Sequence, residues 1–295
     1  MKILVTGASG FIGSNVCRYL KNQGHEVFPL CSNTCAVSDE FKDTAVFLGM
    51  FGFDTNVFKH IDGVVHLAAN NDTVSKQASE MMNANYYDSK NLLKIAMKHG
   101  CEFFVYASST AVYGNAGDVL NEEKKARPLN IYAKSKLKFD KFMEKNSPGI
   151  RWVGLRLCNI YGPGEMLKGR RASYLGQMMY KMLNNKPVEL FEDGKQQRDW
   201  CYVQDVCQAF SKAIHTKQNG IFNIGSGESV SFNDLFSILS DATGYTEKPV
   251  WIPNEYKRQY QNFTQVDFTK ATRFFNYTPE FNVKNGILEY LRCQI

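Results

Sequence analysis

Three glycines, each three residues after the last, directly follow the first apolar run of the chain. Residues 2–5 have the apolar character of a buried strand, and Gly7, Gly10 and Gly13 come after them. Residues 11–23 then carry apolar side chains at helical spacing. Glycines between a strand and a helix permit a tight turn and let a pyrophosphate approach the N-terminus of the helix. The chain therefore opens with a predicted dinucleotide-binding unit.

The alternation of apolar runs and helical segments continues through the first half of the chain. Because these strands are apolar along their whole length, we expect a parallel sheet that helices cover on both faces. The predicted architecture is an α/β, Rossmann-type, doubly wound parallel sheet. Its expected strands are residues 2–5, 26–30, 44–48, 63–67, 103–107 and 152–157, and its expected helices are residues 11–23, 81–98 and 132–144.

Beyond Tyr161 the periodicity loosens, and prolines and aromatic residues become more frequent. We expect a dinucleotide-binding domain over residues 1–157, to which the chain returns near residues 199–226. Residues 158–198 and 227–295 are expected to form a smaller C-terminal α/β lobe that binds the substrate. The elements predicted in this half are helices over residues 172–184 and 230–241, short strands over residues 188–190, 220–224 and 250–252, and an apolar stretch over residues 200–213.

Composition and charge are those of a soluble enzyme of 295 residues, with 44% hydrophobic residues, 22% charged residues and a net charge of +6. The positive charge favours anionic ligands such as nucleotides, but no run of like charges indicates a nucleic-acid partner. No apolar run approaches the roughly 18 residues of a membrane span. The first residues predict a strand rather than a signal peptide. We therefore expect a cytoplasmic protein with no nucleic-acid or membrane partner.

Eight cysteines are scattered along the chain. The closest pair, Cys31 and Cys35, lacks a second pair and flanking histidines, so no metal site is expected. In a reducing compartment the cysteines are expected to serve as small apolar side chains.

The most informative chemical feature is the pair Tyr132 and Lys136, which lie four residues apart in a predicted helix. This spacing places both side chains on one helix face. A phenol has an ordinary pKa of about 10 and is a poor base at neutral pH, but a neighbouring ammonium favours the phenolate and lowers that pKa. The pair therefore predicts a base for a sugar hydroxyl, and with the dinucleotide site it predicts redox chemistry at a carbinol carbon.

A serine-rich turn, residues 107–114, follows the strand expected at residues 103–107. At the carboxyl end of a strand in a doubly wound sheet, a hydroxyl of this turn faces the cleft. We expect it to share a hydrogen bond with the substrate hydroxyl and with Tyr132.

The residues after the strand at 63–67 suit close approach of a dinucleotide. Leu67, Ala68 and Ala69 form an apolar flank. His66 is expected to be a structural residue beside the cofactor cleft, with a role as catalytic base as the alternative. Asn85, on the next predicted helix, is expected either to hydrogen-bond the cofactor region or to face solvent.

The end of the strand at residues 26–30 bears on the choice of cofactor. Such a strand normally ends in an acid that binds the adenosine ribose of NAD, yet residues 30–34 contain none. No arginine follows to hold a 2′-phosphate, and the nearest basic residue is Lys42. NAD and NADP both stay open, and the small polar side chains of Ser32 and Asn33 favour NADP.

These motifs together resemble those of the extended short-chain dehydrogenases/reductases that act on nucleotide sugars, within the NAD-dependent epimerase/dehydratase family. The resemblance spans about the whole chain and rests on residues 6–13, 66–69, 108–114, 132–136, 159–163, 198–199 and 203–206. It implies that Ser109, Tyr132 and Lys136 abstract a hydroxyl proton while tightly bound NAD or NADP takes the hydride. It also implies that Lys136 contacts the cofactor ribose and that the protein is a homo-oligomer. The implied cofactor contacts are Gly7, Gly10, Phe11, Ile12, Gly13, Ser32, Asn33, Leu67, Ala68, Ala69, Asn85, Ala107, Tyr132, Lys136 and Ile160.

The choice among members of this family is narrowed by what the chain lacks. The 4,6-dehydratases carry an Asp-Glu pair just after the serine or threonine of this strand, where this chain has Thr110 and Ala111. The acid and base for water elimination are therefore absent. Tyr113 and Gly114 argue against the fucose-synthase-like members, so epimerases remain.

The second half of the chain resembles the ADP-glycero-manno-heptose 6-epimerases. The distinctive segments are residues 162–169, with the pattern Gly-Pro-x-Glu-x-x-Lys-Gly, and residues 258–265. In that family a lysine at the position of Lys168 is a second catalytic base that faces Tyr132. Epimerisation removes hydride from one face and returns it to the other, so two acid/base groups let each alkoxide be protonated in place. Binding of a phosphate is the alternative role for Lys168.

The same resemblance implies a substrate site and shows where this chain departs from the pattern. Arg198 is expected to bind a substrate phosphate, with an ion pair to Asp199 or Asp205 as the alternative. The departures are Arg170, where the family has a small hydroxyl residue, and Gln177, where it has a histidine. The expected substrate contacts are Ser108, Asn159, Lys168, Phe191, Gly194, Arg198 and Tyr260.

We therefore expect a nucleotide-sugar epimerase that oxidises a carbinol to a ketone and returns hydride to the opposite face, at carbon 6 of a nucleotide-activated heptose. Its expected partner is a nucleotide-diphosphate sugar. A UDP-hexose 4-epimerase, which uses the tyrosine alone and rotates the ketone, is the nearest rival. A nucleotide-sugar dehydrogenase or reductase is a third candidate, and a non-catalytic dinucleotide-sensing protein on the same fold is a fourth.

Overall fold

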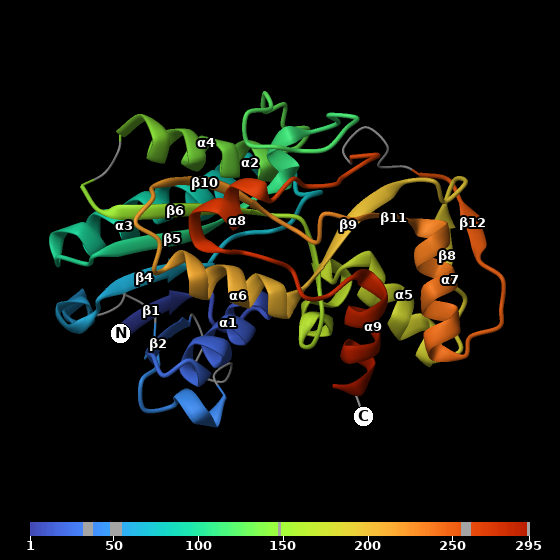
Figure 1. Ribbon diagram of the computed structural model, residues 1–295, viewed down its shortest axis with the longest axis horizontal. Helices are drawn as coiled ribbons and strands as arrows, with labels where there is room; N and C mark the ends of the chain where they lie inside the picture. The colour runs from blue at the N-terminus through green and yellow to red at the C-terminus, as the bar shows by residue number, and fades with distance from the viewer. Residues whose placement is uncertain (32–37, 48–54, 147–148, 255–260, 294–295) are drawn as a thin grey trace.

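A sheet of seven parallel strands forms the centre of the computed structural model, which describes residues 1–31, 38–47, 55–146, 149–254 and 261–293 (Figure 1). The strand order is β10-β6-β5-β4-β1-β2-β3. The order reverses between β1 and β4, and ligands of such sheets bind outside the carboxyl ends of the strands at this point. The expected Rossmann-type sheet is confirmed. Its strands are β1 (Lys2–Thr6), β2 (Glu26–Cys31), β3 (Val46–Phe47), β4 (Gly63–His66), β5 (Phe103–Ser109), β6 (Arg151–Leu157) and β10 (Gly220–Ile224).

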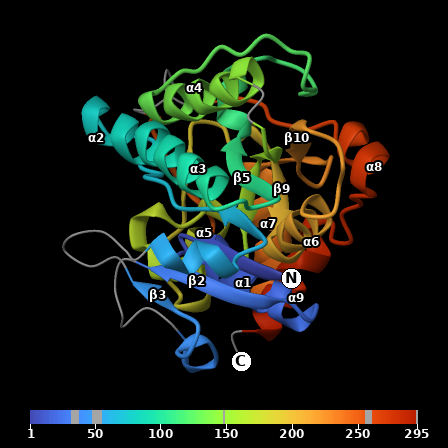
Figure 2. The same ribbon diagram turned by 90° about the vertical axis from the view of Figure 1, so that its left-hand side faces the viewer.

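Helices cover both faces of this sheet (Figures 1 and 2). The α-helices are α1 (Phe11–Asn22), α2 (Ala78–Met82), α3 (Asp88–Lys98), α4 (Ile131–Asn146), α5 (Tyr174–Leu183), α6 (Val203–Ala213), α7 (Phe232–Thr243), α8 (Thr269–Phe275) and α9 (Val283–Arg292). On one face α1, α6 and α8 form a buried apolar cluster with strand residues that include Val5, and on the other α3 and α4 form a second cluster with Leu4. Neighbouring strand residues point to opposite faces of a sheet, which is why Leu4 and Val5 belong to different clusters.

A third apolar cluster lies beside the large sheet, on the right in Figure 1. It joins α5, α7 and α9 to two small sheets, of strand order β11-β9-β7 and β12-β8. The chain passes back to the large sheet through α6 and β10. The exact boundaries of the two expected lobes stay a prediction. The small strands are β7 (Asn159–Tyr161), β8 (Glu189–Phe191), β9 (Gln197–Tyr202), β11 (Ser229–Ser231) and β12 (Val250–Ile252).

Short helical turns connect several of these elements. The 3₁₀ turns are η2 (Asp39–Phe41), η3 (Thr55–His60), η5 (Thr110–Tyr113) and η6 (Glu165–Arg171), and the π turn is η4 (Asn83–Tyr87). The helix expected over residues 81–98 is present as one continuous run through α2, η4 and α3, and a π-helical segment interrupts its α-helical hydrogen bonding. Such wider turns are frequent at functional sites.

Other expected elements differ in extent or were missed. The strand expected at residues 44–48 is only Val46–Phe47 within the described residues. The apolar stretch at 200–213 contains a change of structure, since β9 ends at Tyr202 and α6 begins at Val203. Helices α8 and α9 were not expected, because each is short and buries only a narrow apolar face. None of the described helices is long and apolar enough to cross a membrane.

Candidate active site

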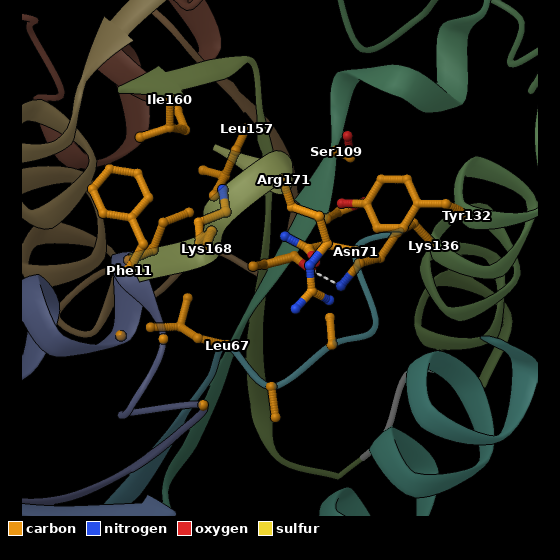
Figure 3. Close-up of a pocket in the computed structure, with 18 of the residues that line it drawn as sticks. Phe11, Leu67, Asn71, Ser109, Tyr132, Lys136, Leu157, Ile160, Lys168 and Arg171 are labelled. Atoms are coloured by element: carbon orange, nitrogen blue, oxygen red, sulfur yellow. Dashed lines mark hydrogen bonds between the residues drawn. The ribbon is translucent and has the colours of Figure 1, made fainter. Parts of the chain in front are cut away.

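A pocket of about 600 Å³ opens at the carboxyl ends of β1, β4 and β5 (Figure 3). Its volume lies within the usual range for small-molecule sites, about 300–1,000 Å³. Three cationic side chains and no acidic one line it among the described residues, which suits an anionic ligand. The lining residues are Gly7, Ser9, Gly10, Phe11, Ile12, Gly13, Leu67, Ala68, Ala69, Asn71, Ala107, Ser108, Ser109, Tyr132, Lys136, Leu157, Cys158, Ile160, Lys168 and Arg171.

The glycine turn forms the floor of the pocket through very close backbone contacts. Gly7 has φ +67°, and a Cβ on it would lie 2.6 Å from the backbone nitrogen of Ala68. A Cβ on Gly13 would lie 2.1 Å from the carbonyl oxygen of Gly7. Larger residues at these two positions would therefore push the turn away from β4 or from α1. These contacts agree with the prediction that the glycines permit a tight turn.

The N-terminus of α1 faces the pocket with its backbone amides uncapped by side chains. Gly10 is the N-cap residue and makes no side-chain cap, and the first turn of α1 contains no acidic residue. Free N–H groups and the helix dipole attract an anion at such a site. Together with the close-packed glycine turn, this terminus fits the pyrophosphate of a dinucleotide.

The loop after β4 is held by a buried histidine and threonine. Oγ1 of Thr6 accepts hydrogen bonds from the backbone N–H groups of Leu67 (3.2 Å) and Ala68 (3.1 Å), and it lies 2.7 Å from Nδ1 of His66. Nε2 of His66 lies 2.8 Å from the hydroxyl of Ser89. Burial and the charge of Lys136 lower the pKa of His66 to about 3. His66 is therefore neutral and supports the pocket wall from behind.

Asn85 lies behind the wall of the pocket. Its Oδ1 accepts a 2.8 Å hydrogen bond from the backbone N–H of Asn70, and its Nδ2 donates to the carbonyl oxygen of Asn70 (2.9 Å) and to the hydroxyl of Ser135 (2.9 Å). Asn85 is buried and absent from the pocket lining. The alternative of solvent exposure is wrong, because the π turn directs the amide to the loop after β4 and to α4. Its expected contact with the cofactor stays a prediction.

The predicted pair and the serine meet at one side of the pocket (Figure 3). Nζ of Lys136 donates a 2.9 Å hydrogen bond to the carbonyl oxygen of Ala107. Burial lowers the pKa of Lys136 to about 8, and the charge of Asp140 opposes this shift. Burial raises the pKa of Tyr132, and a hydrogen bond with Ser109 lowers it. Burial therefore outweighs the other influences on the pKa of Tyr132, and the role of Lys136 in favouring the phenolate stays a prediction.

Ser108 and Ser109 differ in the direction of their side chains. Ser109 ends β5, and its hydroxyl also accepts a 3.2 Å hydrogen bond from the backbone N–H of Ala111. The hydroxyl of Ser108 instead donates to Oδ2 of Asp140 at 3.0 Å and is buried. The hydroxyl of Ser108 is thus bonded to Asp140 although Ser108 lines the pocket, and its expected contact with the substrate stays a prediction.

The turn η6 brings two cationic residues to the opposite side of the pocket. Figure 3 shows Lys168 and Phe11 across from Tyr132 and Lys136, with Arg171 between them. Nζ of Lys168 lies 5.3 Å from the ring centroid of Phe11, the first residue of α1. Burial lowers the pKa of Lys168, and the charge of Glu165 opposes this shift. The second predicted base thus shares one pocket with the first.

A buried carboxylate holds η6 in place. Oε1 of Glu165 accepts a 3.1 Å hydrogen bond from the backbone N–H of Gly162, and Oε2 accepts one of 2.7 Å from that of Ser173. Glu165 has no exposed surface. The chain also bends sharply at Gly169, whose φ of 56° and ψ of −129° interrupt the helical turn. These two features determine where Lys168 and Arg171 point.

Five residues of the pocket wall were missed from the sequence: Ser9, Asn71, Leu157, Cys158 and Arg171. For Arg171 a signal existed, since three of the four residues from 168 to 171 are basic. Ser9 and Cys158 adjoin residues that were predicted, Asn71 and Leu157 lie two residues from one, and no motif marks these four side chains.

Several expected substrate contacts lie outside the described pocket lining. Nδ2 of Asn159 donates to the carbonyl oxygen of Asp199 at 3.1 Å. The ring of Phe191 lies 5.7 Å from that of Tyr174. Gly194 packs against Asn233, whose backbone N–H donates a 3.1 Å hydrogen bond to the carbonyl oxygen of Gly194. These three residues are held by structural contacts, and their expected contact with substrate stays a prediction.

Arg198 makes its described contacts with neighbouring residues of the smaller sheets and of α7. Its guanidinium lies 5.5 Å from the ring centroid of Phe232 and donates to the carbonyl oxygen of Gln197 at 2.9 Å. Oδ2 of Asp199 accepts backbone hydrogen bonds from Gly227 and Val266, both at 3.0 Å. The role of Arg198 in binding phosphate stays a prediction. Three more residues of the predicted site, Ser32, Asn33 and Tyr260, lie outside the described residues.

Residues 3–225 match the model of the NAD dependent epimerase/dehydratase family. The chain belongs to this family. The matched region contains the glycine turn, Ser109, Tyr132, Lys136 and Lys168. The expected membership is confirmed, and the protein is an NAD-dependent isomerase of the epimerase type.

Similar proteins cover this epimerase from end to end. An ADP-L-glycero-D-manno-heptose-6-epimerase of Cupriavidus pinatubonensis is 31% identical over 100% of this chain and 98% of its own. The crystal structure of the Helicobacter pylori ADP-L-glycero-D-manno-heptose-6-epimerase has a TM-score of 0.87 and 32% identity, over 99% of this chain and 95% of that one. The Thermotoga maritima UDP-glucose 4-epimerase with UDP-glucose has a TM-score of 0.89 and 28% identity, over 100% and 99%. Heptose and hexose epimerases thus share this architecture.

Proposed function

We propose that this epimerase inverts carbon 6 of the heptose in a nucleotide-diphosphate heptose. The observation that carries the proposal is the position of Lys168, which lines the same pocket as Tyr132 from the opposite side. The similarity to two heptose 6-epimerases along the whole chain supports it. The three cationic side chains of the pocket also suit the two diphosphate groups that a dinucleotide cofactor and a nucleotide-diphosphate sugar would bring together.

The first half of the proposed reaction takes place on the side of the pocket where Tyr132 lies. The phenolate of Tyr132 takes the proton of the substrate hydroxyl, and Ser109 holds that hydroxyl by a hydrogen bond. The ammonium of Lys136 stabilises the phenolate by its charge. A nicotinamide dinucleotide held by the glycine turn and the N-terminus of α1 would supply a hydride acceptor for the carbinol carbon and a hydride donor for the other face of the resulting ketone.

The second half needs a proton donor for an oxygen that occupies a different position. Inversion moves the hydroxyl oxygen to the other side of the carbon, away from Tyr132. Lys168 can give this oxygen its proton because burial lowers the pKa of its ammonium. In the reverse direction the two residues exchange roles as acid and base. A single base would require the ketone to rotate within the pocket.

The family is described as NAD dependent, and for this chain we propose a preference for the 2′-phosphorylated form, NADP, with NAD itself as the alternative. Residues 30–34 contain no acid to bind the adenosine ribose, which is the reason for favouring NADP. The cofactor released from purified protein by heat and identified by mass decides between the two. We also propose a cytoplasmic homo-oligomer, to be tested by light scattering and by cell fractionation.

The experiment that tests the function uses a panel of ADP-, GDP- and UDP-sugars with NMR detection of both epimers. We expect inversion of an ADP-heptose and no turnover of UDP-glucose. Lys168→Ala is expected to lower kcat by about 10²- to 10⁴-fold. The matched control is Arg170→Ala, which removes an exposed neighbouring cation outside the pocket lining.

A UDP-hexose 4-epimerase is the second candidate, favoured by the TM-score of 0.89 to such an enzyme. Turnover of UDP-glucose with little effect of Lys168→Ala would establish it in place of the heptose reaction. Reduced cofactor that accumulates in proportion to substrate would instead indicate a net dehydrogenase. Incorporation of solvent deuterium at the inverted carbon would contradict direct oxidation in favour of enolisation.

A further inference from the structure

A buried carboxylate lies behind the catalytic pair. Asp140 is on α4 one turn after Lys136 and has no exposed surface. Its Oδ1 accepts a hydrogen bond of 3.1 Å from the hydroxyl of Tyr106. Its Oδ2 accepts one of 3.0 Å from the hydroxyl of Ser108 and one of 2.9 Å from Nε of Arg156. Three donors, one of which is the paired cation Arg156, allow a carboxylate to stay ionised inside a protein.

The hydrogen bonds of this carboxylate fix the end of the strand that carries the catalytic serine. The two hydroxyls that bind Asp140 lie on either side of Ala107 in β5. The carbonyl oxygen of Ala107 accepts the hydrogen bond from Lys136, and β5 ends at Ser109. Asp140 thereby joins the helix that carries the catalytic pair to the strand that carries the serine.

Charged and titratable groups on four other elements also face this region. Arg156, on β6, pairs with Asp140, and its NH1 donates a 2.9 Å hydrogen bond to the hydroxyl of Tyr113 on η5. On β4, His66 is neutral because burial lowers its pKa. On β5, burial and the charge of Asp140 raise the pKa of Tyr106, so its hydroxyl stays protonated. Further along α4, Glu144 is exposed.

Asp140 supplies the negative charge that acts on the buried ammonium. Burial lowers the pKa of Lys136 to about 8, and the charge of Asp140 works against this. The side chain of Tyr132, also on α4, is protonated unless it serves as the base. Without Asp140 the ammonium would lose its proton at a lower pH, because desolvation would act unopposed and Arg156 would add a like charge.

We propose that Asp140 is a positioning residue of the epimerase, whose negative charge supports the ammonium of Lys136 one helical turn away and whose hydrogen bonds align β5 with α4. The proposal rests on the proposed function for the reaction that it serves, though the protonation of Lys136 can be measured without turnover. Asp140 touches no pocket surface. It acts on the substrate through the pocket residues that it positions, which are Lys136 and the end of β5.

The test is Asp140→Asn, which removes the charge and keeps the shape of the side chain. In protein labelled with ¹³C at lysine Cε, NMR follows the titration of Lys136, assigned with Lys136→Met. We expect the midpoint of Lys136 in Asp140→Asn to fall by about one pH unit. The alkaline limb of the pH profile of kcat should fall by the same amount, since the ammonium is the active form.

Tyr106→Phe is the matched control, because it removes a hydrogen bond from the same carboxylate and leaves every charge in place. We expect its Lys136 titration and its pH profile to stay where they are in the parent protein. Asp140→Asn leaves Arg156 unpaired and can prevent folding. In that case Asp140→Asn combined with Arg156→Gln removes both charges, and the midpoint of Lys136 is again expected below that of the parent protein.

An unchanged Lys136 titration in a folded variant without Asp140 would overturn the proposal, whatever the loss of rate. An equal shift in Tyr106→Phe would also overturn it, since the effect would then come from packing. Failure of the proposed function would give a different experimental result from failure of the Asp140 proposal. The protein would bind the cofactor and epimerise no sugar, while the titration of Lys136 would still decide the role of Asp140.

Discussion

Burial determines the charge states of the residues around the pocket more than their charged neighbours do. It raises the pKa of Tyr132, lowers that of Lys136 to about 8 and lowers that of His66 to about 3. It also lowers the pKa of Lys168. The site therefore holds a neutral histidine and two lysines that release protons more readily than exposed lysines do, which suits a reaction that moves protons between hydroxyls.

His66 makes the stability of the protein depend on pH. Its pKa is lowered from 6.5 to about 3 in the folded protein, so between these values only the unfolded chain binds the proton. The contribution of His66 is complete above pH 6.5 and is lost as the pH falls. We expect the free energy of unfolding to drop by about 1.4 kcal/mol for each pH unit below about 6. Urea unfolding between pH 4 and 7 measures this slope.

Variants of His66 and of a second histidine separate the contribution of His66 to this slope from the contributions of other titratable groups. His66→Gln should reduce the slope by about 1.4 kcal/mol per pH unit, because glutamine takes up no proton. The control is His60→Gln, at an exposed position of η3, which should keep the slope of the parent protein. A slope that His66→Gln leaves unchanged would show that His66 is charged in the folded state.

Among the structural elements, η6 has the greatest influence on the site for its size. It carries both Lys168 and Arg171, and its direction changes at Gly169. Little of it packs into a core, since Leu167 is 90% exposed. Its position therefore depends on backbone conformation and on the hydrogen bonds of Glu165 rather than on apolar packing.

Gly169→Ala is expected to disturb catalysis and leave global stability almost unchanged. Nothing lies within 4 Å of an added Cβ, so the effect comes from the backbone, whose φ of 56° and ψ of −129° suit only glycine. The resulting shift of Lys168 should lower kcat about 10- to 100-fold. Melting temperature and kcat together measure the two effects.

Gly149→Ala is the matched control, because that residue also has open space around it but no positive φ. It should keep the activity and the melting temperature of the parent protein. Full activity of Gly169→Ala would show that the bend in η6 is not needed to place Lys168.

The sequence predicts the features that depend on residue spacing within one element. It does not predict side-chain directions that depend on contacts with distant residues. The glycine turn with α1 and the pair on α4 follow from spacing within a single element. The inward direction of Ser108 depends on Asp140, 32 residues away in the chain. The direction of Asn85 depends on a π turn and on Ser135, 50 residues away. The pattern of apolar and polar residues in these two segments does not indicate such distant partners.

At the scale of the whole molecule, the pocket lies where the apolar core of the sheet meets the segment after β7. Asn15 of α1 shows how closely the two are joined, since its Nδ2 donates a 3.0 Å hydrogen bond to the carbonyl oxygen of Pro163. A dinucleotide bound at the N-terminus of α1 would contact the glycine turn, the loop after β4 and η6 together. Binding should therefore stabilise the fold as a unit.

This stabilisation can be measured as a rise in melting temperature on adding cofactor to protein freed of nucleotide. At a concentration 100 times the Kd, binding adds about 2.7 kcal/mol to the stability and should raise the midpoint by roughly 5 °C. We expect a larger rise with NADP than with NAD, because residues 30–34 contain no acid. Gly13→Ala should abolish the rise, since its Cβ would lie 2.1 Å from the oxygen of Gly7. Gly149→Ala should retain it, and a parent protein that neither nucleotide stabilises would contradict the assignment of the glycine turn to the cofactor.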